Sequence, residues 1–207
     1  MSIGSSSETR TVLDQISWDT YQRLADERRG SVPRIVYDRG RMELMSPGRQ
    51  HEKLASLIGR LIEAYSEQAG IEIDSAASTT FRRIDLERGF EADRAYYIQH
   101  APLMRPKMEV DLSVDPPPDL VVEVEITSST IRKMELFASM GVPEVWRCDG
   151  SQLVVSHLQG DDYVESSSSQ TFPGLALDMV ESILTQRFDI GENALIATFR
   201  DRVSGCE

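Results

Sequence analysis

The chain has 207 residues, of which 40% are apolar and 27% are charged, a composition typical of a folded domain that excludes wholesale disorder. The formal net charge of −12, from 34 acidic and 22 basic residues, argues against a general nucleic-acid-binding surface, because Lys and Arg normally neutralise phosphates. Cys148 and Cys206 have neither disulfide-framework nor metal-ligand spacing, and no apolar run approaches the roughly 18 residues of a membrane span. We therefore expect a cytoplasmic protein with no membrane segment.

The length of the chain suits one domain, and the elements predicted below make it an α/β domain with short extensions. We expect residues 1–14 to be a flexible N-terminus, residues 15–190 to form the domain, and residues 191–207 to form a C-terminal helix or tail. Basic residues are concentrated between positions 82 and 107, a segment with six basic and four acidic residues. This part of the chain could therefore still face a polyanion.

The first half of the domain predicts a helix, a hairpin and a second helix. Residues 18–30 follow a serine suited to capping a helix and end at a glycine. Residues 34–45 read as two short strands around Arg39-Gly40, which is typical of a hairpin. A long helix is predicted before Gly70, because apolar residues recur there at helical spacing; this stripe consists of Leu54, Leu57, Ile58, Leu61, Ile62 and Tyr65.

The second half of the domain is predicted to form mostly strands. Beta-rich segments lie at 71–84 and 92–98, and four prolines make residues 99–117 too irregular to assign. Residues 119–126, DLVVEVEI, form the strongest predicted strand. The remaining elements are predicted in chain order as a helix at 130–140, three successive strands at 143–149, 152–158 and 162–168, and helices at 177–188 and 192–203.

Acidic residues on two neighbouring predicted strands form the main candidate site. Side chains alternate along residues 119–126, so Glu123 and Glu125 share one face. Such carboxylates repel each other unless water or a cation separates them, and the plain alternative is a strand with a solvated outer face. Asp93 opens the preceding strand and can converge with Glu123 on one point. Two or three carboxylate oxygens suit Mg²⁺ or Mn²⁺, which would polarise a phosphoryl oxygen and lower the pKa of a bound water.

Lys133 lies among apolar residues of the predicted helix at 130–140. At 100° per residue, Arg132 and Glu135 lie on the polar face, whereas Lys133 falls on the apolar one. A lysine in that place either extends to solvent or meets an anion. The preceding turn would bring its ammonium over Glu123 or Glu125, where it could orient an attacking water or stabilise charge on a phosphate.

The order of these motifs resembles that of a known family. The motifs are Met45-Ser-Pro47, His51-Glu52, EADRAYYI at 91–98, PDLVVEVEITS at 118–128, Lys133, and GVPEVWR at 141–147. Over about residues 15–190 they resemble the Uma-type family of restriction-endonuclease-like proteins, within the PD-(D/E)XK nuclease superfamily. The match is partial at two positions, because Glu125 stands where the signature has lysine and Ala92 stands where it has proline.

The resemblance implies a PD-(D/E)XK core, in which helices flank a mixed central sheet and an N-terminal helix and β-hairpin are added. It also implies a divalent metal ion, Mg²⁺ or Mn²⁺, and a homodimer. Residue by residue, it implies that Asp93 and Glu123 are metal ligands and that Glu125 is a further acidic ligand of the site. Lys133 would be the catalytic lysine, displaced to the following helix.

His51 and Glu52 begin the long helix, and either is a candidate catalytic residue. The apolar stripe centred near Leu57 and Ile58 places His51 on its flank and Glu52 almost opposite. This favours His51 facing inward. The plain alternative for Glu52 is a favourable position beside the positive end of the helix dipole.

These observations lead to two functional hypotheses. The first is a Mg²⁺-dependent endonuclease that hydrolyses phosphodiester bonds in DNA. The second is a catalytically inactive dimeric module that keeps the nuclease fold for binding or regulation, and it is motivated by the acidic surface and the displaced lysine.

Overall fold

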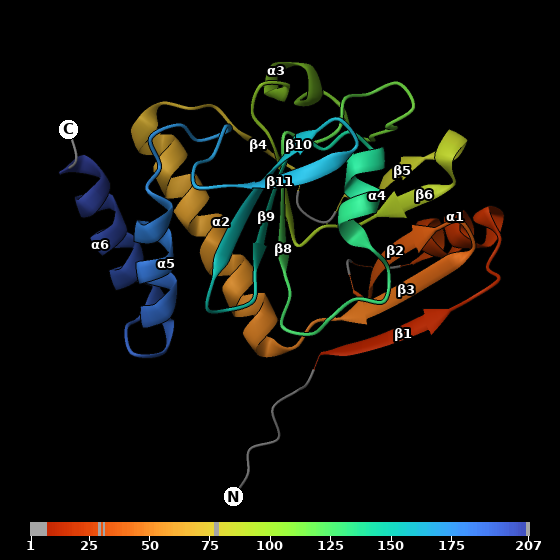
Figure 1. Cartoon of the computed structure of the whole chain (residues 1–207), viewed down its shortest axis with the longest axis horizontal. Coiled ribbons are helices and arrows are strands. Elements are labelled where there is room, and N and C mark those ends of the chain that lie inside the picture. Colours follow the sequence, from red (N-terminus) through yellow and green to blue (C-terminus); the bar gives the residue numbers. More distant parts are fainter. Residues whose placement is uncertain (1–7, 29, 31, 77–78, 206–207) are drawn as a thin grey trace, which may run out of the picture.

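The structure is a computed structural model that describes residues 8–28, 30, 32–76 and 79–205. Within these ranges the chain forms two sheets, and helices pack on both sides of the larger one (Figure 1). None of the helices in these ranges is long and apolar enough to cross a membrane. Of the two cysteines, Cys148 is buried and unpaired, whereas Cys206 lies outside the described residues.

The smaller sheet is antiparallel throughout, in the order β1-β3-β2-β6-β5. Its strands are β1 (Thr9–Leu13), β2 (Arg34–Asp38), β3 (Arg41–Ser46), β5 (Phe81–Arg83) and β6 (Arg88–Phe90). The predicted hairpin is confirmed as β2 and β3, and Gly40 takes the positive φ of 94° that its turn requires. The prediction of a flexible N-terminus is wrong for Thr9–Leu13, because these residues pair with β3; residues 1–7 lie outside the described ranges.

The larger sheet is mixed, in the order β11-β10-β9-β8-β7-β4. Its strands are β4 (Asp74–Ser75), β7 (Arg94–Tyr97), β8 (Leu120–Val124), β9 (Glu144–Cys148), β10 (Leu153–Gln159) and β11 (Asp162–Ser166). Only the β8–β9 pair of this sheet is parallel among the described strands. The three successive strands predicted near the end of the domain are confirmed as the antiparallel run β9-β10-β11.

Six α helices occur in the described ranges, and two short 3₁₀ turns accompany them. The helices are α1 (Trp18–Glu27), α2 (Arg49–Ala69), α3 (Ala101–Met104), α4 (Lys133–Ser139), α5 (Leu177–Thr185) and α6 (Glu192–Ser204); the 3₁₀ turns are η1 (Ile84–Leu86) and η2 (Gln186–Phe188). The long predicted helix is α2, which ends at Gly70 in the left-handed conformation. The expected C-terminal helix is α6, and it packs against α2.

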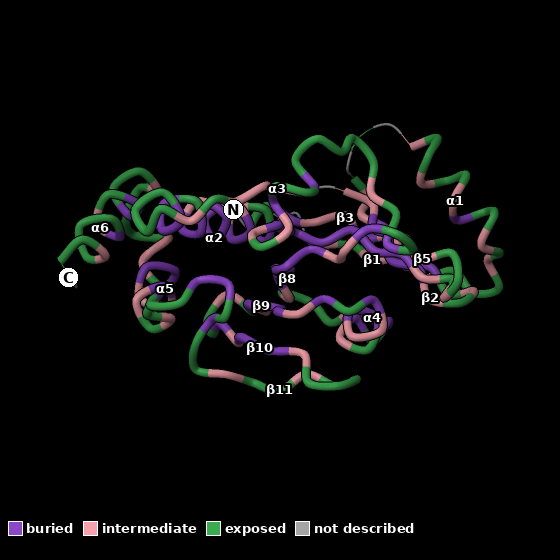
Figure 2. Tube along the Cα trace, turned by 90° about the horizontal axis from the view of Figure 1, so that it is seen from above, coloured by how far each residue is buried: buried purple, intermediate pink, exposed green. Residues whose placement is uncertain are grey.

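The two faces of the larger sheet bury separate cores (Figure 2). One face packs against α2, α5 and α6, using the alternate residues Leu120, Val122 and Val124 of β8. The other face packs against α4 and the smaller sheet, using Val121. Because β8 is buried on both sides, a charged residue on this strand must find its partners inside the protein.

The parallel β8–β9 connection positions the candidate site. Parallel neighbours need a crossover, and here the chain leaves the end of β8, passes through α4 and returns as β9. The helix therefore covers the face of β8 that carries Val121 and Glu123. Lys133, the first residue of α4, lies beside that face.

Candidate active site

Asp93 and Glu123 are neighbours on one face of the larger sheet. In the antiparallel β7–β8 pair Arg94 faces Val122, and one further step of the same register sets Asp93 against Glu123. The backbone N–H of Val124 donates to Asp93 Oδ2 at 2.7 Å. Asp93 is 3% exposed and Glu123 is 1% exposed, so the two acidic groups predicted to converge do so inside the protein.

Lys133 meets an anion rather than solvent. Its side chain is 8% exposed and its ammonium donates to Glu123 Oε2. Burial alone would lower the pKa of Lys133, but the negative charges of Glu123 and Asp93 raise it above the usual value. The prediction that this lysine lies over the acidic strand is confirmed, with Glu123 as its partner.

The second carboxylate oxygen of Glu123 has no hydrogen-bond partner within the described part of the chain. This atom, Oε1, is fully buried. Burial raises the pKa of Glu123 to about 7; the negative charge of Asp93 adds to this effect, and Lys133 opposes it. An unsatisfied buried carboxylate oxygen is rare because it loses the solvation of its charge, and a cation is the partner that suits it.

His51 links Asp93 to the N-terminal strand. Its Nε2 lies 2.7 Å from Asp93 Oδ1, and its Nδ1 lies 2.7 Å from Glu8 Oε2. A carboxylate only accepts hydrogen bonds, so a protonated imidazole satisfies both contacts. Burial alone would lower the pKa of His51, but the hydrogen bond and charge of Asp93, with the hydrogen bond to Glu8, raise it. The inward orientation predicted for His51 is confirmed.

Arg34 separates the buried part of the site from Glu52. The Arg34 guanidinium lies 2.6 Å from Asp93 Oδ1 and 3.0 Å from Glu52 Oε1. The side chain of Glu52 is 48% exposed, in keeping with its predicted place opposite the apolar stripe. Burial alone would raise the pKa of Asp93, yet His51 and Arg34 hold it below its usual value.

Glu125, predicted as a third acidic ligand, is not brought into the buried group. The strand β8 ends at Val124, one residue earlier than the alternation of side chains requires. The Glu125 backbone N–H donates to Cys148 O at 2.8 Å. Its side chain is 37% exposed and lies 3.8 Å from Arg147. The negative charge of Glu125 therefore has only a small effect on Glu123, whose pKa it raises.

Four residues of the site were not predicted: Glu8, Arg10, Arg34 and Glu43. Arg10 bridges two of the acids, at 2.6 Å from Glu8 and 2.5 Å from Glu43. Glu43 also accepts from the backbone N–H of Thr130 at 3.0 Å, which fixes the turn before α4. A lone acid inside the apolar segment MELM could have pointed to Glu43, whereas no local pattern marks Glu8.

The side chains present could hold a divalent cation only if water molecules completed its coordination. No group of three or more His, Cys, Asp and Glu side chains in the described ranges is arranged as a preformed metal site. Asp93 and Glu123 provide two carboxylates, one of which has a free oxygen. Mg²⁺ keeps several waters and commonly takes only one or two protein carboxylates, so this pair is chemically suitable.

Comparisons with known proteins identify a family and a similar fold. Residues 18–186 match the Uma2 family, described as "Putative restriction endonuclease". A crystal structure from Anabaena variabilis, described as "a putative nuclease belonging to DUF820", is 14% identical in sequence; it covers 82% of this chain and 99% of its own, with a TM-score of 0.58. No match was found among curated proteins.

The matched segment includes Asp93, Glu123 and Lys133, together with His51 and Arg34. At 14% identity the structural likeness shows the fold alone, which is the restriction-endonuclease-like α/β fold predicted from the sequence. Because the family match spans most of the chain, this protein belongs to the Uma2 family.

Proposed function

We propose that this protein is a Mg²⁺- or Mn²⁺-dependent endonuclease that hydrolyses phosphodiester bonds in DNA. The observation that carries the proposal is the buried Asp93–Glu123 pair, with Lys133 on the same face. In the part of the chain that the structure describes, one oxygen of Glu123 has no hydrogen-bond partner. The family and the fold support a nuclease in general. The metal, the DNA substrate and the role of each residue are our proposal.

Asp93 and Glu123 would hold the ion. When bound, a divalent cation polarises a phosphoryl oxygen and lowers the pKa of a water. Glu123 Oε1 offers a free buried oxygen for it. His51 and Arg34 hold the pKa of Asp93 below its usual value, so this carboxylate carries the negative charge that a cation would need at neutral pH.

Lys133 would stabilise charge that develops on the phosphate. In the structure its ammonium is bound to Glu123. A cation held by Glu123 would weaken this ion pair, and the Lys133 ammonium could then turn to a phosphoryl oxygen. Removal of one such preorganised donor typically lowers kcat by roughly 10²–10³-fold.

The test is cleavage of plasmid and linear DNA by the full chain with Mg²⁺, with Mn²⁺ and with EDTA. We expect nicking or cleavage that requires the metal and disappears in Asp93→Ala and Glu123→Ala. Asp161→Ala, at an exposed position on the turn between β10 and β11, is the control and should retain activity. Full activity in both site variants would refute the mechanism.

One observation favours the second candidate, a dimeric binding or regulatory module without catalysis. Arg34, His51 and Lys133 already neutralise Asp93 and Glu123, an arrangement that a purely structural ion-pair cluster would also show. Calorimetric titration with Mg²⁺ and Mn²⁺ separates the two candidates. Binding that is lost in Glu123→Gln supports the nuclease, whereas a folded protein that binds neither ion, even with DNA present, supports the module. The predicted homodimer is tested separately by light scattering.

A further inference from the structure

An open hollow lies beside α2, on the side of the helix that faces the turn between α5 and α6. It has a volume of about 730 Å³. Two of its cationic residues, Lys53 and Arg60, come from α2, and a third, Arg187, comes from η2. The neighbouring residue of η2, Phe188, also lines it and is 65% exposed.

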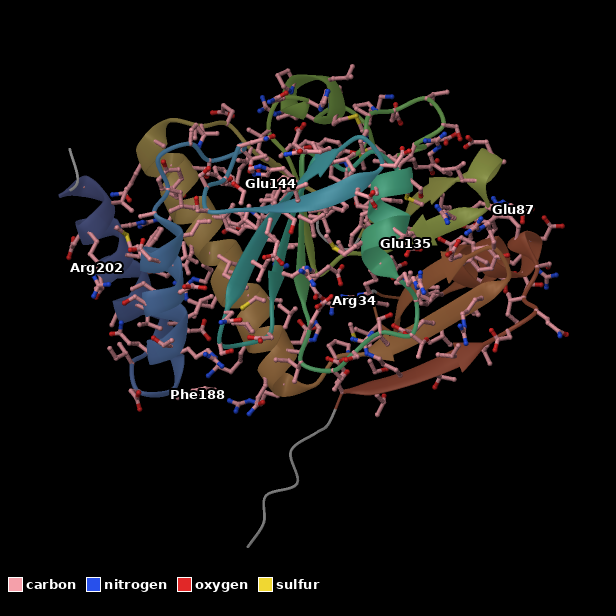
Figure 3. The ribbon with its side chains drawn as sticks, in the orientation of Figure 1. Arg34, Glu87, Glu135, Glu144, Phe188 and Arg202 are labelled. Carbon is pink, nitrogen blue, oxygen red and sulfur yellow. The ribbon has the colours of Figure 1, made fainter. Side chains whose placement is uncertain are left out.

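Arg187 and Phe188 form a stacked pair at the edge of this hollow. The Arg187 guanidinium carbon lies 4.3 Å from the centre of the Phe188 ring. The guanidinium also donates to the Leu184 carbonyl at 2.7 Å, which fixes its position on the ring. Figure 3 shows Phe188 at the lower surface of the molecule. A largely exposed aromatic ring held beside an arginine suits a nucleic-acid base, which stacks on the ring while the cation attracts phosphate.

Arg187, which lines the hollow, and Ile126, in the loop that follows β8, both lie close to Gly150. A Cβ added at Gly150 would lie 3.2 Å from Arg187 Nη2 and 3.6 Å from Ile126 Cδ1. The next residue, Thr127, accepts from Arg10 Nε at 3.0 Å, in the network around His51. In Figure 1 the first turns of α2, the end of β8 and the α5–α6 turn all lie at the lower end of the molecule. The hollow and the loop that follows β8 therefore lie at the same end of the molecule.

The basic residues between positions 82 and 107 do not offer a comparable surface. Five of the six form ion pairs with acids of the same chain, at distances of 3.0 Å or less; they are Arg82, Arg83, Arg88, Arg105 and Lys107. Most of the positive charge in this part of the sequence is therefore neutralised by acidic residues of the same chain.

The hollow has a small excess of positive charge. Asp189 and Glu192 also line it, and Glu192 pairs with Arg60 at 3.3 Å. Lys53 and Arg187 therefore carry the attraction for a phosphate. In a chain with a net charge of −12, two cations and one ring suit a short single-stranded stretch better than the long polyanionic face of a duplex.

We infer that this hollow binds a single-stranded segment of the nucleic-acid substrate, with one base on Phe188 and its phosphates near Lys53 and Arg187. The inference rests on the proposed nuclease function and narrows the substrate to DNA with an unpaired stretch beside the cleaved bond. A single strand of RNA presents the same phosphates and bases, and the experiment includes it for this reason.

The test is equilibrium binding of fluorescein-labelled 20-nucleotide single strands of DNA and RNA, and of the DNA duplex, in EDTA so that no cleavage occurs. We expect the wild-type chain to bind the single strands more tightly than the duplex. Phe188→Ala should weaken single-strand binding roughly tenfold. Lys53→Ala should reduce the dependence of log affinity on log salt by about 0.7.

The matched controls are Leu103→Ala and Arg105→Ala at α3, on the opposite end of the molecule in Figure 1. Both side chains are 54% exposed, so each control removes a comparable exposed group, and neither should change binding. If Phe188→Ala binds as well as Leu103→Ala, or if the wild-type chain binds no single strand, the inference is overturned.

A cleavage assay with the same variants distinguishes this inference from the proposed function. If the wild-type chain cleaves DNA but Phe188→Ala and Lys53→Ala bind and cleave equally well, the hollow is not the binding surface and the nuclease function stands. If Phe188 is needed for binding but no metal supports cleavage, the hollow is correct and the catalytic proposal fails.

Discussion

Two glutamates on the neighbouring parallel strands β8 and β9 are equally buried but differ in their partners. Glu123 and Glu144 are each 1% exposed. Glu123 has the ammonium of Lys133 on one oxygen and, among the described residues, no hydrogen-bond partner on the other. Glu144 has partners on both oxygens, and Figure 3 shows it at the end of the sheet away from Arg34; its donors are Trp146 Nε1, Ser169 Oγ, Thr171 Oγ1 and the backbone N–H groups of Gln170 and Thr171.

The difference distinguishes a carboxylate whose hydrogen bonds are all satisfied from the one that we propose as a metal ligand. Four of the five donors to Glu144 belong to residues 169–171 and tie this segment to β9. Together the five donors leave no capacity for a ligand. Glu123 keeps an unsatisfied oxygen in a site where Asp93 adds a second negative charge. Residue type and burial alone would not have distinguished the two, whereas counting their hydrogen-bond partners does.

The largest expected effect is the loss of activity in Glu123→Gln. This variant keeps the size of the side chain but removes the charge that would hold a metal, a contribution worth several kcal/mol to the transition state. We expect kcat/KM for DNA cleavage to fall roughly a thousandfold. Circular dichroism should show an unchanged fold, and near-wild-type cleavage by the folded variant would remove Glu123 from the site.

The matched change at Glu144→Ala should act on stability instead. It leaves several buried donors without an acceptor, so we expect the free energy of unfolding to fall by about 3 kcal/mol or more. Urea unfolding measures this loss. Activity per folded molecule should stay within about twofold of wild type, and a specific loss of kcat at full stability would contradict a structural role.

The pH dependence of stability gives a third test. Glu123 has a folded-state pKa of about 7 against an ordinary value of 4.5, so its contribution to stability is fully present below about pH 4.5 and lost as pH rises through 7. The shift corresponds to about 3 kcal/mol. The groups that face it are Asp93, Lys133 and Glu125.

We therefore expect the unfolding free energy of the wild-type chain to decline over this pH window relative to that of Glu123→Gln. The comparison uses the difference between the two proteins, because His51 and Asp93 titrate in both. If the free energies of unfolding of the two proteins changed in parallel from pH 4 to pH 8, burial would not raise the pKa of Glu123 in this way.

A smaller effect is expected at Glu8→Gln. Glu8 accepts from His51, which donates in turn to Asp93, so the change would act on the proposed metal ion through two intervening groups. Loss of such an outer-shell partner typically weakens metal binding roughly tenfold or somewhat more. Calorimetric titration with Mn²⁺ measures it, and Asp14→Asn, an exposed acid just beyond β1, is the control.

The smallest effect is expected at Glu125→Ala. The side chain is partly exposed and has one long contact, to Arg147 at 3.8 Å. Stability should change by about 0.5 kcal/mol or less, and cleavage should change far less than in Glu123→Gln. A loss of activity as large as that of Glu123→Gln would restore Glu125 as a third metal ligand.

The sequence predicted those parts of the fold and site that depend on local periodicity. The stripe of α2 located the long helix and turned His51 inward. The alternation of β8 assigned Glu123 to one face, and the helical wheel singled out Lys133. Each of these follows from the regular geometry of a helix or strand.

The remaining parts depend on contacts between distant segments or on where an element ends. Glu8 reaches His51 across 43 positions and Arg34 reaches Asp93 across 59, and no local period encodes such pairs. Thr9–Leu13 became a strand only because β3 offers an edge to pair with. Glu125 was misplaced because the end of β8 is set by the turn after Val124, and the ends of strands are weakly encoded.

The pairing of β1 with β3 has a practical consequence for anyone shortening the chain. The family match begins at residue 18, and a version trimmed to that boundary would look complete by sequence comparison. It would discard Glu8 and Arg10, leaving His51 with Asp93 as its remaining carboxylate partner and Glu43 without the Arg10 guanidinium. If such a truncated protein folded but did not cleave DNA, the loss of β1 would explain the result. It would not show that the full chain is inactive.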